Sequence, residues 1–229
     1  MNSTATARTA FVPVPAPVAT GRDVEILSRL NDPDTALAIW RRDLPHGLAR
    51  WLAALDPAQL PDTRLLVKTG DLPAAIDAMI AASPLPAVRE RQRLADDVFT
   101  LAWRFATFLG LDAVDIRLER VVHDGCWKFH RDHVPARLVS TYAGPGTEWV
   151  HPDFADRALV EQQDYAGPLE RLTAGDAALF RGCVHAHGNT HHRHGIVHRS
   201  PPIAGTGTVR LLLCLNPPSL ASPPLWRAM

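Results

Sequence analysis

The second half of the chain consists of short apolar segments interrupted by Gly and Pro, and this pattern limits the possible fold more than any other feature. From Val114 to Val121 apolar and charged residues alternate, which is typical of a strand with one buried face. Further short β-rich segments follow at 138–142, 147–150, 177–180, 196–198 and 209–215. Several strands at this spacing predict a sandwich or barrel rather than alternating βαβ units.

The first half of the chain carries helical periodicity instead. Apolar residues recur three and four positions apart in four segments, for which we predict helices: 32–40, 48–55, 72–82 and 86–109. One short strand is expected among them, at Thr63–Lys68. The expected organisation is a mobile tail at 1–20, a helical region at 21–112, a β domain at 113–216 and a Pro-rich tail at 217–229.

Composition narrows the class of protein. A chain of 229 residues with 46% hydrophobic residues can bury a real core. Its 24 basic and 24 acidic residues cancel, which argues against nucleic acid or an anionic membrane as partner. No apolar run reaches membrane-spanning length, and the first residues lack a secretory pattern. Three widely spaced cysteines fit a reducing compartment, so we expect a cytoplasmic protein.

Two imidazoles and one carboxylate form a candidate metal site. His130 and Asp132 are two residues apart, so on a strand they point to the same face. With His198 they make the set that holds non-haem Fe(II) on one side and leaves the other side open. Taken singly, a His-x-Asp pair is most often solvated, and a lone histidine is most often an ordinary hydrogen-bonded residue.

Arg210 stands in an otherwise apolar run, twelve residues after His198. A buried guanidinium without an anion is costly, so a partner is expected. That partner is either an internal Asp or Glu, or the carboxylate of a ligand held by a two-pronged hydrogen bond.

The order of these motifs resembles that of the 2-oxoglutarate and Fe(II)-dependent oxygenases. The shared pattern is the His-x-Asp motif, a Gly175-Asp176 turn into an apolar strand, the distal histidine and the late arginine. The resemblance covers about residues 115–216. It implies an α+β fold with a double-stranded β-helix core (jelly-roll, cupin-like) and the N-terminal helical region packed outside it. The whole chain also resembles a bacterial domain-of-unknown-function family.

The same resemblance implies roles for individual residues. Fe(II) would sit on His130, Asp132 and His198, and Arg210 would pair with the far carboxylate of 2-oxoglutarate. Many members of the superfamily place Ser or Thr two residues after this arginine, whereas here that position is Leu212. Thr141 or Tyr142 would then help to bind the co-substrate.

A second candidate metal site lies in a histidine-rich segment between the Gly-Asp turn and His198. Its potential ligands are Cys183, His185, His187, His191, His192 and His194. The segment could bind Zn(II), or it could be a polar loop that binds metals weakly. His185 or His187 could also replace His198 as the distal ligand. We prefer His198 because its interval to Arg210 matches one turn between adjacent strands.

The sequence therefore predicts a non-haem Fe(II)- and 2-oxoglutarate-dependent oxygenase of the hydroxylase type, acting on a small-molecule or peptide substrate. Two alternatives stay open: a cupin-like protein that buffers or senses zinc, and a partner-binding barrel with a vestigial site. The sequence leaves both monomer and oligomer open.

Overall fold

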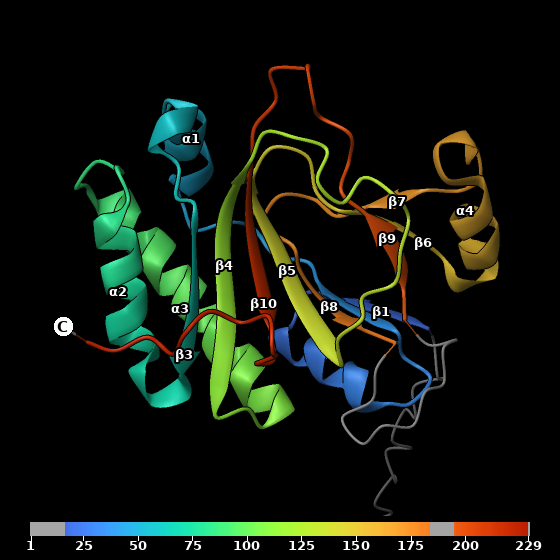
Figure 1. The fold of residues 1–229 in the computed structure, drawn as a ribbon, viewed down its shortest axis with the longest axis horizontal. Helices are drawn as coiled ribbons and strands as arrows, with labels where there is room; N and C mark the ends of the chain where they lie inside the picture. The colour runs from blue at the N-terminus through green and yellow to red at the C-terminus, as the bar shows by residue number, and fades with distance from the viewer. Residues whose placement is uncertain (1–16, 184–194, 229) are drawn as a thin grey trace, which may run out of the picture.

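The computed structural model describes residues 17–183 and 195–228, in which a large and a small β-sheet face each other (Figure 1). The seven strands of the large sheet are, in spatial order, β1 (Val18–Gly21), β2 (Leu37–Trp40), β8 (Ala177–Arg181), β5 (Ala136–Ala143), β10 (Arg210–Asn216), β4 (Ala113–Val121) and β3 (Thr63–Lys68). The small sheet has the order β7 (Glu170–Arg171), β6 (Glu148–Val150) and β9 (Val197–Arg199). All strand pairs are antiparallel except β1 with β2.

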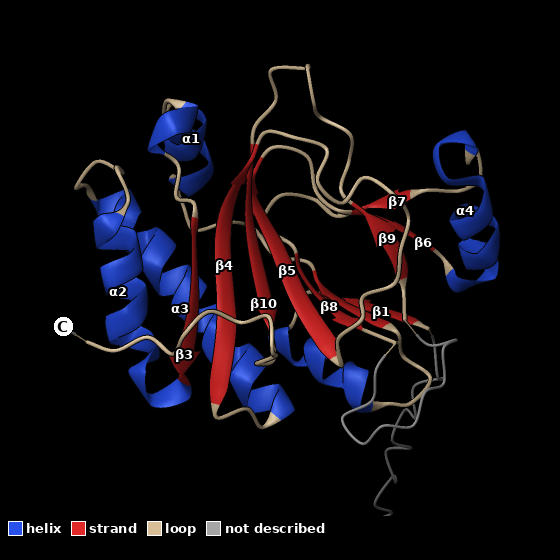
Figure 2. Cartoon of the chain, viewed as in Figure 1, coloured by secondary structure: helices blue, strands red, loops and turns tan. Residues whose placement is uncertain are grey.

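Helices cover the outer sides of the sheets (Figure 2). They are α1 (Leu48–Ala53), α2 (Leu72–Ala82), α3 (Arg89–Leu109) and α4 (Ala155–Glu161). The buried stripe of α3 packs with the outward-facing leucines of β10 in the main core, and α4 packs on the small sheet. No helix within the described ranges combines the length and the apolar character needed to cross a membrane.

The side chains of β10 point alternately to the main core on the helix side and to the interior between the two sheets. Leu211, Leu213 and Leu215 are fully buried on the helix side. Leu212 and Cys214 face the other way and pack with a second cluster between the two sheets. The even-numbered residues of β10 are therefore the ones that can reach a site between the sheets.

Most predicted elements are confirmed. Strand β3 has the predicted bounds, α2 matches its prediction, and α3 begins at Arg89, three residues after the predicted start. The strands from β4 onward lie within one or two residues of the predicted β segments, except β7, which no predicted segment covers. Helix α4 also has no predicted counterpart. The structure thus contains the β-rich second half that Gly and Pro spacing indicates.

The helix predicted at 32–40 is wrong. Leu37–Trp40 is strand β2, which lies between β1 and β8 in the large sheet and buries Leu37, Ala38 and Ile39 completely. A strand buried on both faces is a continuous apolar run, and such a run cannot be told from a helical stripe by periodicity. β1 also begins at Val18, inside the predicted tail. Together β1, β2 and β3 are the three strands that the N-terminal part of the chain contributes to the large sheet.

The chain after Asn216 runs along the edge of the large sheet. Leu225 forms an isolated bridge with Leu66 of β3, and the Trp226 amide donates to the Leu66 carbonyl (2.7 Å). Figure 1 shows this last segment beside β3. Prolines limit the pairing to this short contact.

Candidate metal centre

The small sheet places two histidines side by side. His130 and His198 exchange both backbone hydrogen bonds, at 3.0 and 3.1 Å, so the 130 segment extends the sheet beyond β9. Their imidazole rings lie 4.5 Å apart between centroids. Residues far apart in the sequence are thus held at a spacing that the backbone ladder sets.

Asp132 completes the cluster. One carboxylate oxygen lies 3.6 Å from His130 Nε2 and the other lies 3.4 Å from His198 Nε2. One ligand atom from each of the three residues lies within 4.8 Å of the others. The Asp132 Oδ2 atom is buried and has no hydrogen-bond partner in the described part of the chain. A buried carboxylate oxygen of this kind, beside two ring nitrogens, fits a divalent cation.

Both imidazoles are oriented through their other nitrogen. His130 Nδ1 lies 2.8 Å from the Lys128 carbonyl oxygen, and His198 Nδ1 lies 3.1 Å from the Ile196 carbonyl oxygen. A carbonyl only accepts hydrogen bonds, so each Nδ1–H donates, and in the neutral form of each ring Nε2 carries the free lone pair. Such an outer hydrogen bond is the usual support of a metal-ligating histidine.

Burial and charge set the protonation of the cluster. Burial lowers the pKa of His198 to about 4, so this ring is neutral at pH 7. Burial raises the pKa of Asp132, but its hydrogen bond with His130 and the nearby charges, including Arg137, outweigh this and the net pKa is lowered. The pKa of His130 is raised, chiefly by its side-chain hydrogen bond with Asp132. An ionised carboxylate and a neutral buried imidazole are the forms that bind metal.

Arg210 lies on the same face of β10 as Leu212 and Cys214. It is fully buried (0% exposed), and its Nη2 donates to the hydroxyl of Thr147 (3.3 Å). Within the described residues its Nε and Nη1 atoms have no hydrogen-bond partner. Burial lowers the pKa of Arg210 to about 10, which still leaves it charged at pH 7. A buried cation with two unsatisfied donors fits an anionic ligand.

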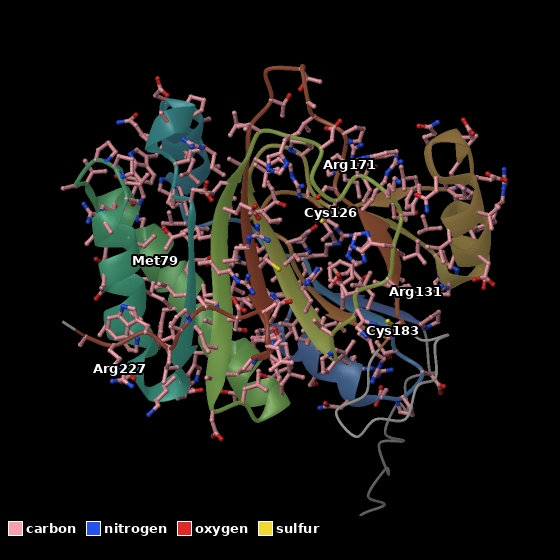
Figure 3. All side chains as sticks on the ribbon, viewed as in Figure 1. Met79, Cys126, Arg131, Arg171, Cys183 and Arg227 are labelled. Carbon is pink, nitrogen blue, oxygen red and sulfur yellow. The ribbon has the colours of Figure 1, made fainter. Side chains whose placement is uncertain are left out.

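A cavity of about 270 Å³ lies between the sheets and reaches the metal centre. Its lining includes His130, His198 and Thr147, together with apolar and basic side chains of the large sheet. Cys126, labelled in Figure 3, also lines it and lies between the large sheet and β9. The triad therefore borders a space large enough for a small molecule.

The structure separates the two residues predicted to replace the missing hydroxyl. Thr141 is buried opposite Leu212, which lines the cavity. Tyr142 is the extra residue of a bulge between β5 and β10, and its hydroxyl donates to Asp97 of α3 (2.6 Å) on the helix side. Tyr142 therefore points away from the cavity, and its geometry gives the predicted co-substrate role no support.

Most of the histidine-rich segment lies outside the described residues: His185, His187, His191, His192 and His194. Cys183 is described, and its thiol contacts the Asp132 carbonyl oxygen (3.2 Å) and His133 Nδ1 (3.6 Å). The described residues give the Zn(II) prediction no support. His185 and His187 as alternative distal ligands fall in the same undescribed segment.

Three residues of the site carry no assigned role in the sequence reading. Arg137 donates from Nη1 to Asp132 and from Nε to Asn216 (2.8 Å). The Thr147 hydroxyl accepts a hydrogen bond from Arg210. Gly144 lies against the backbone of 209–210, where an added Cβ would be 2.4 Å from the Val209 carbonyl oxygen. Strand alternation places Arg137 on the face of Val139, but no sequence signal indicates the Thr147 contact.

A family model described as "Protein of unknown function (DUF1826)" matches residues 21–216. No curated protein matches the sequence.

Several solved structures resemble the fold. A dioxygenase for auxin oxidation from rice shares 17% identity with a TM-score of 0.46, covering 91% of this chain and 86% of its own. The Arabidopsis thaliana enzyme AtDAO1, in a complex with 2-oxoglutarate, shares 12% identity at 0.46, covering 91% and 96%. HygX from Streptomyces hygroscopicus, with nickel and 2-oxoglutarate bound, shares 14% identity at 0.41, covering 90% of each chain. At these identities and TM-scores the likeness indicates nothing about the function of this chain.

Proposed function

The chain belongs to the DUF1826 family, and we propose that it is a non-haem Fe(II)- and 2-oxoglutarate-dependent oxygenase of the hydroxylase type that acts on a small molecule. One observation carries the proposal. A preformed His-Asp-His cluster with a partnerless carboxylate oxygen lies between the same two sheets as a fully buried arginine with two unsatisfied donors.

The chain path supports the fold that this function implies. After β5 in the large sheet the chain forms β6 and β7 in the small sheet, returns with β8, crosses again with β9 and ends with β10. Repeated crossing between two facing antiparallel sheets is the pattern of a jelly roll. We propose that these strands form a double-stranded β-helix core.

His130, Asp132 and His198 would hold the metal. Two neutral imidazoles and a carboxylate on one side suit non-haem Fe(II) and leave positions free for other ligands. When bound, Fe(II) and 2-oxoglutarate supply O₂-dependent oxidation of a substrate C–H bond, coupled to loss of CO₂ from the co-substrate. The protein fixes the ligands through the carbonyls of Lys128 and Ile196.

Arg210 would bind the far carboxylate of 2-oxoglutarate. Its Nε and Nη1 lack partners within the described chain, so a carboxylate could accept from both. The Thr147 hydroxyl beside the guanidinium stands where it can assist, which compensates for Leu212 at the position of the usual hydroxyl. Thr141, opposite Leu212, is a second candidate for this assistance.

Anaerobic titration with Fe(II) and 2-oxoglutarate tests the proposal. We expect a weak visible absorption band from the chelated complex, and succinate on admission of air. The His198→Ala variant removes a metal ligand and is expected to lose the band. The matched control is His46→Ala, since His46 is an exposed residue outside the cavity.

Arg210→Gln separates the two ligands. This variant is expected to keep metal binding and to require at least tenfold more 2-oxoglutarate for the band, because a charge-assisted contact is lost. Absence of both band and succinate in the unaltered protein, at saturating Fe(II), would rule the proposed activity out.

A further inference from the structure

The wall of the cavity that belongs to the large sheet is basic. Arg64 of β3 and Arg117 of β4 are direct cross-strand partners, and both line the cavity. Like charges directly opposite each other destabilise a sheet. Arg64 is held by a two-pronged ion pair with Asp115 (2.9 and 2.7 Å).

Arg117 is the least constrained of these cations. Its side chain is 49% exposed, and its Nη2 pairs with Glu119, two residues along the same strand (2.9 Å). A guanidinium carries five N–H donors, so this single pair leaves donors for a ligand. Arg137, by contrast, is bound to Asp132 and Asn216.

Apolar side chains lie between Arg117 and the metal centre. In the register of the sheet, Cys214 of β10 has Arg117 on one side and Val139 of β5 on the other. Val139, Leu212 and Val121 line the same cavity as His130 and His198. The wall thus runs from a cationic group over an apolar surface toward the histidines.

Basic side chains outnumber acidic ones on this wall. Among the described residues that line the cavity, Arg64, Arg117 and Arg137 are basic and Glu119 is acidic. Asp115 and Asp132, which are not among the lining residues, pair with Arg64 and Arg137. Arg117 is therefore the group on this wall at which an anionic part of a ligand can bind.

We propose that the substrate is a small organic acid with an apolar body, whose single carboxylate binds Arg117, with Arg64 beside it, while its apolar part lies on Val139 and Leu212. This rests on the proposed function, because it names the substrate class of the same site. Arg117 sets specificity, and the apolar surface directs the carbon skeleton toward the metal centre.

Binding of a matched pair of probes tests this inference. Full-length protein with Mn(II) and saturating 2-oxoglutarate is titrated calorimetrically with 3-phenylpropanoate and with the uncharged 3-phenylpropanamide. We expect the carboxylate to bind at least tenfold more tightly than the amide. Arg117→Gln is expected to remove that preference, since it removes the charge-assisted contact.

Arg120→Gln is the matched control. Arg120 lies on the same strand but its Nη1 donates to the Pro57 carbonyl oxygen (3.2 Å), away from the cavity lining. Its replacement removes the same net charge and is expected to change probe binding less than twofold. Equal weakening by both variants, equal binding of the two probes, or loss of binding only in Arg210→Gln would overturn the inference.

The Fe(II) and 2-oxoglutarate absorption band, measured on the same samples, separates the two proposals. A band without Arg117-dependent carboxylate binding rejects the organic-acid site and leaves the oxygenase proposal standing. Arg117-dependent binding without a band supports the anion site and rejects the oxygenase.

Discussion

At the scale of single residues, the Asp132 carboxylate depends on a residue five positions away. Arg137 holds one oxygen of Asp132 and is itself fixed by Asn216 at the end of β10. The other oxygen, Oδ2, is the one left without a partner among the described residues. Arg137 thus orients the carboxylate toward the imidazoles.

We expect Arg137→Gln to weaken Mn(II) binding by about 10- to 100-fold, the usual effect of removing an outer-shell partner. Arg137→Lys should restore part of the affinity, because it keeps the charge. Arg131→Gln is the control, since Arg131 binds the Gly195 carbonyl oxygen and Asp156 instead. Calorimetric titration measures all three, and equal affinity in Arg137→Gln and wild type would contradict the orienting role.

The buried His198 ring gives the metal-free protein a pH-dependent stability. Its folded pKa is about 4, whereas an unfolded histidine has a pKa of about 6.5. As pH falls from 6.5 to 4, the unfolded chain takes up a proton that the folded chain refuses, so the free energy of unfolding decreases. The expected loss is on the order of 3 kcal/mol, from about 1.4 kcal/mol per pKa unit.

Urea unfolding between pH 4 and 7 measures this loss in wild type and in His198→Gln, which lacks the titrating ring. We expect the two stability curves to converge at low pH. Parallel curves over the whole range would show that His198 is not responsible.

The sequence predicts the three clustered side chains because a strand would put His130 and Asp132 on one face and because His198 is followed by Arg210 after a short interval. The hairpin expected between His198 and Arg210 is wrong, since β9 belongs to the small sheet and β10 to the large sheet. It cannot predict the groups that orient them. Every residue has a backbone carbonyl, so the amino-acid sequence does not indicate that the carbonyls of Lys128 and Ile196 orient the two imidazoles. The Thr147 contact with Arg210 depends on the close approach of the Gly144 turn, which only tertiary structure reveals.

At the scale of elements, a buried polar cluster joins α3 to the large sheet. Asp97 of α3 makes a two-pronged ion pair with Arg42 (2.6 and 2.9 Å) and accepts from the Tyr142 hydroxyl (2.6 Å). The side chains of Asp97 and Arg42 are each 9% exposed. This polar cluster therefore fixes the position of helix α3 along the sheet, in addition to the packing of its apolar stripe.

We expect Asp97→Ala to lower the free energy of unfolding by about 3–5 kcal/mol, because it leaves a buried guanidinium without its carboxylate. Asp96→Ala, one residue away on the exposed side of α3, is expected to change it by less than about 0.5 kcal/mol. Chemical denaturation followed by circular dichroism compares the two. Similar losses in both variants would count against the cluster.

The same cluster predicts alkaline sensitivity. Burial raises the pKa of Tyr142 well above 10. Above pH 10 the unfolded chain releases the tyrosine proton and the folded chain keeps it, so the free energy of unfolding falls as pH rises. We expect a steeper decline between pH 10 and 11 in wild type than in Tyr142→Phe, measured by thermal unfolding, and an equal slope would refute this.

Elements are predictable where periodicity and length agree. The 21-residue helix α3 and the alternating strand β4 satisfy both conditions. Strand β2 does not, because its four residues, three of them buried, carry no alternation, and an N-terminal capping pattern precedes them. Its strand identity comes from its neighbours β1 and β8, which the local sequence does not contain.

At the scale of the whole molecule, the large sheet ends at β3, and the C-terminal segment lies on this edge through Leu225 and Trp226. An uncovered edge strand is a template for pairing with another chain. Ending the chain at Asn216 is therefore expected to lower the melting temperature and to increase self-association. Analytical ultracentrifugation over a concentration series detects the latter, and an unchanged monomer fraction would show that the segment does not protect the edge.

The overall division into a helical first half and a β-rich second half is predictable from the sequence, but the assembly of both halves into one sheet is not. β1, β2 and β3 come from the first half and lie at both edges of a sheet whose centre comes from the second. Such pairing joins residues 143 positions apart, as between Leu37 of β2 and Phe180 of β8. No local sequence pattern indicates which strands of the two halves pair with each other.

The reciprocal backbone hydrogen bonds between His130 and His198 have a consequence for metal exchange. Because the ladder sets the spacing of the two imidazoles, an incoming ion must adapt to the protein, and differences in ionic radius are taken up on the open side. Manganese, cobalt and nickel are then expected to occupy one common position with little rearrangement of the polypeptide, so that each can serve as a spectroscopic reporter of what approaches from the cavity.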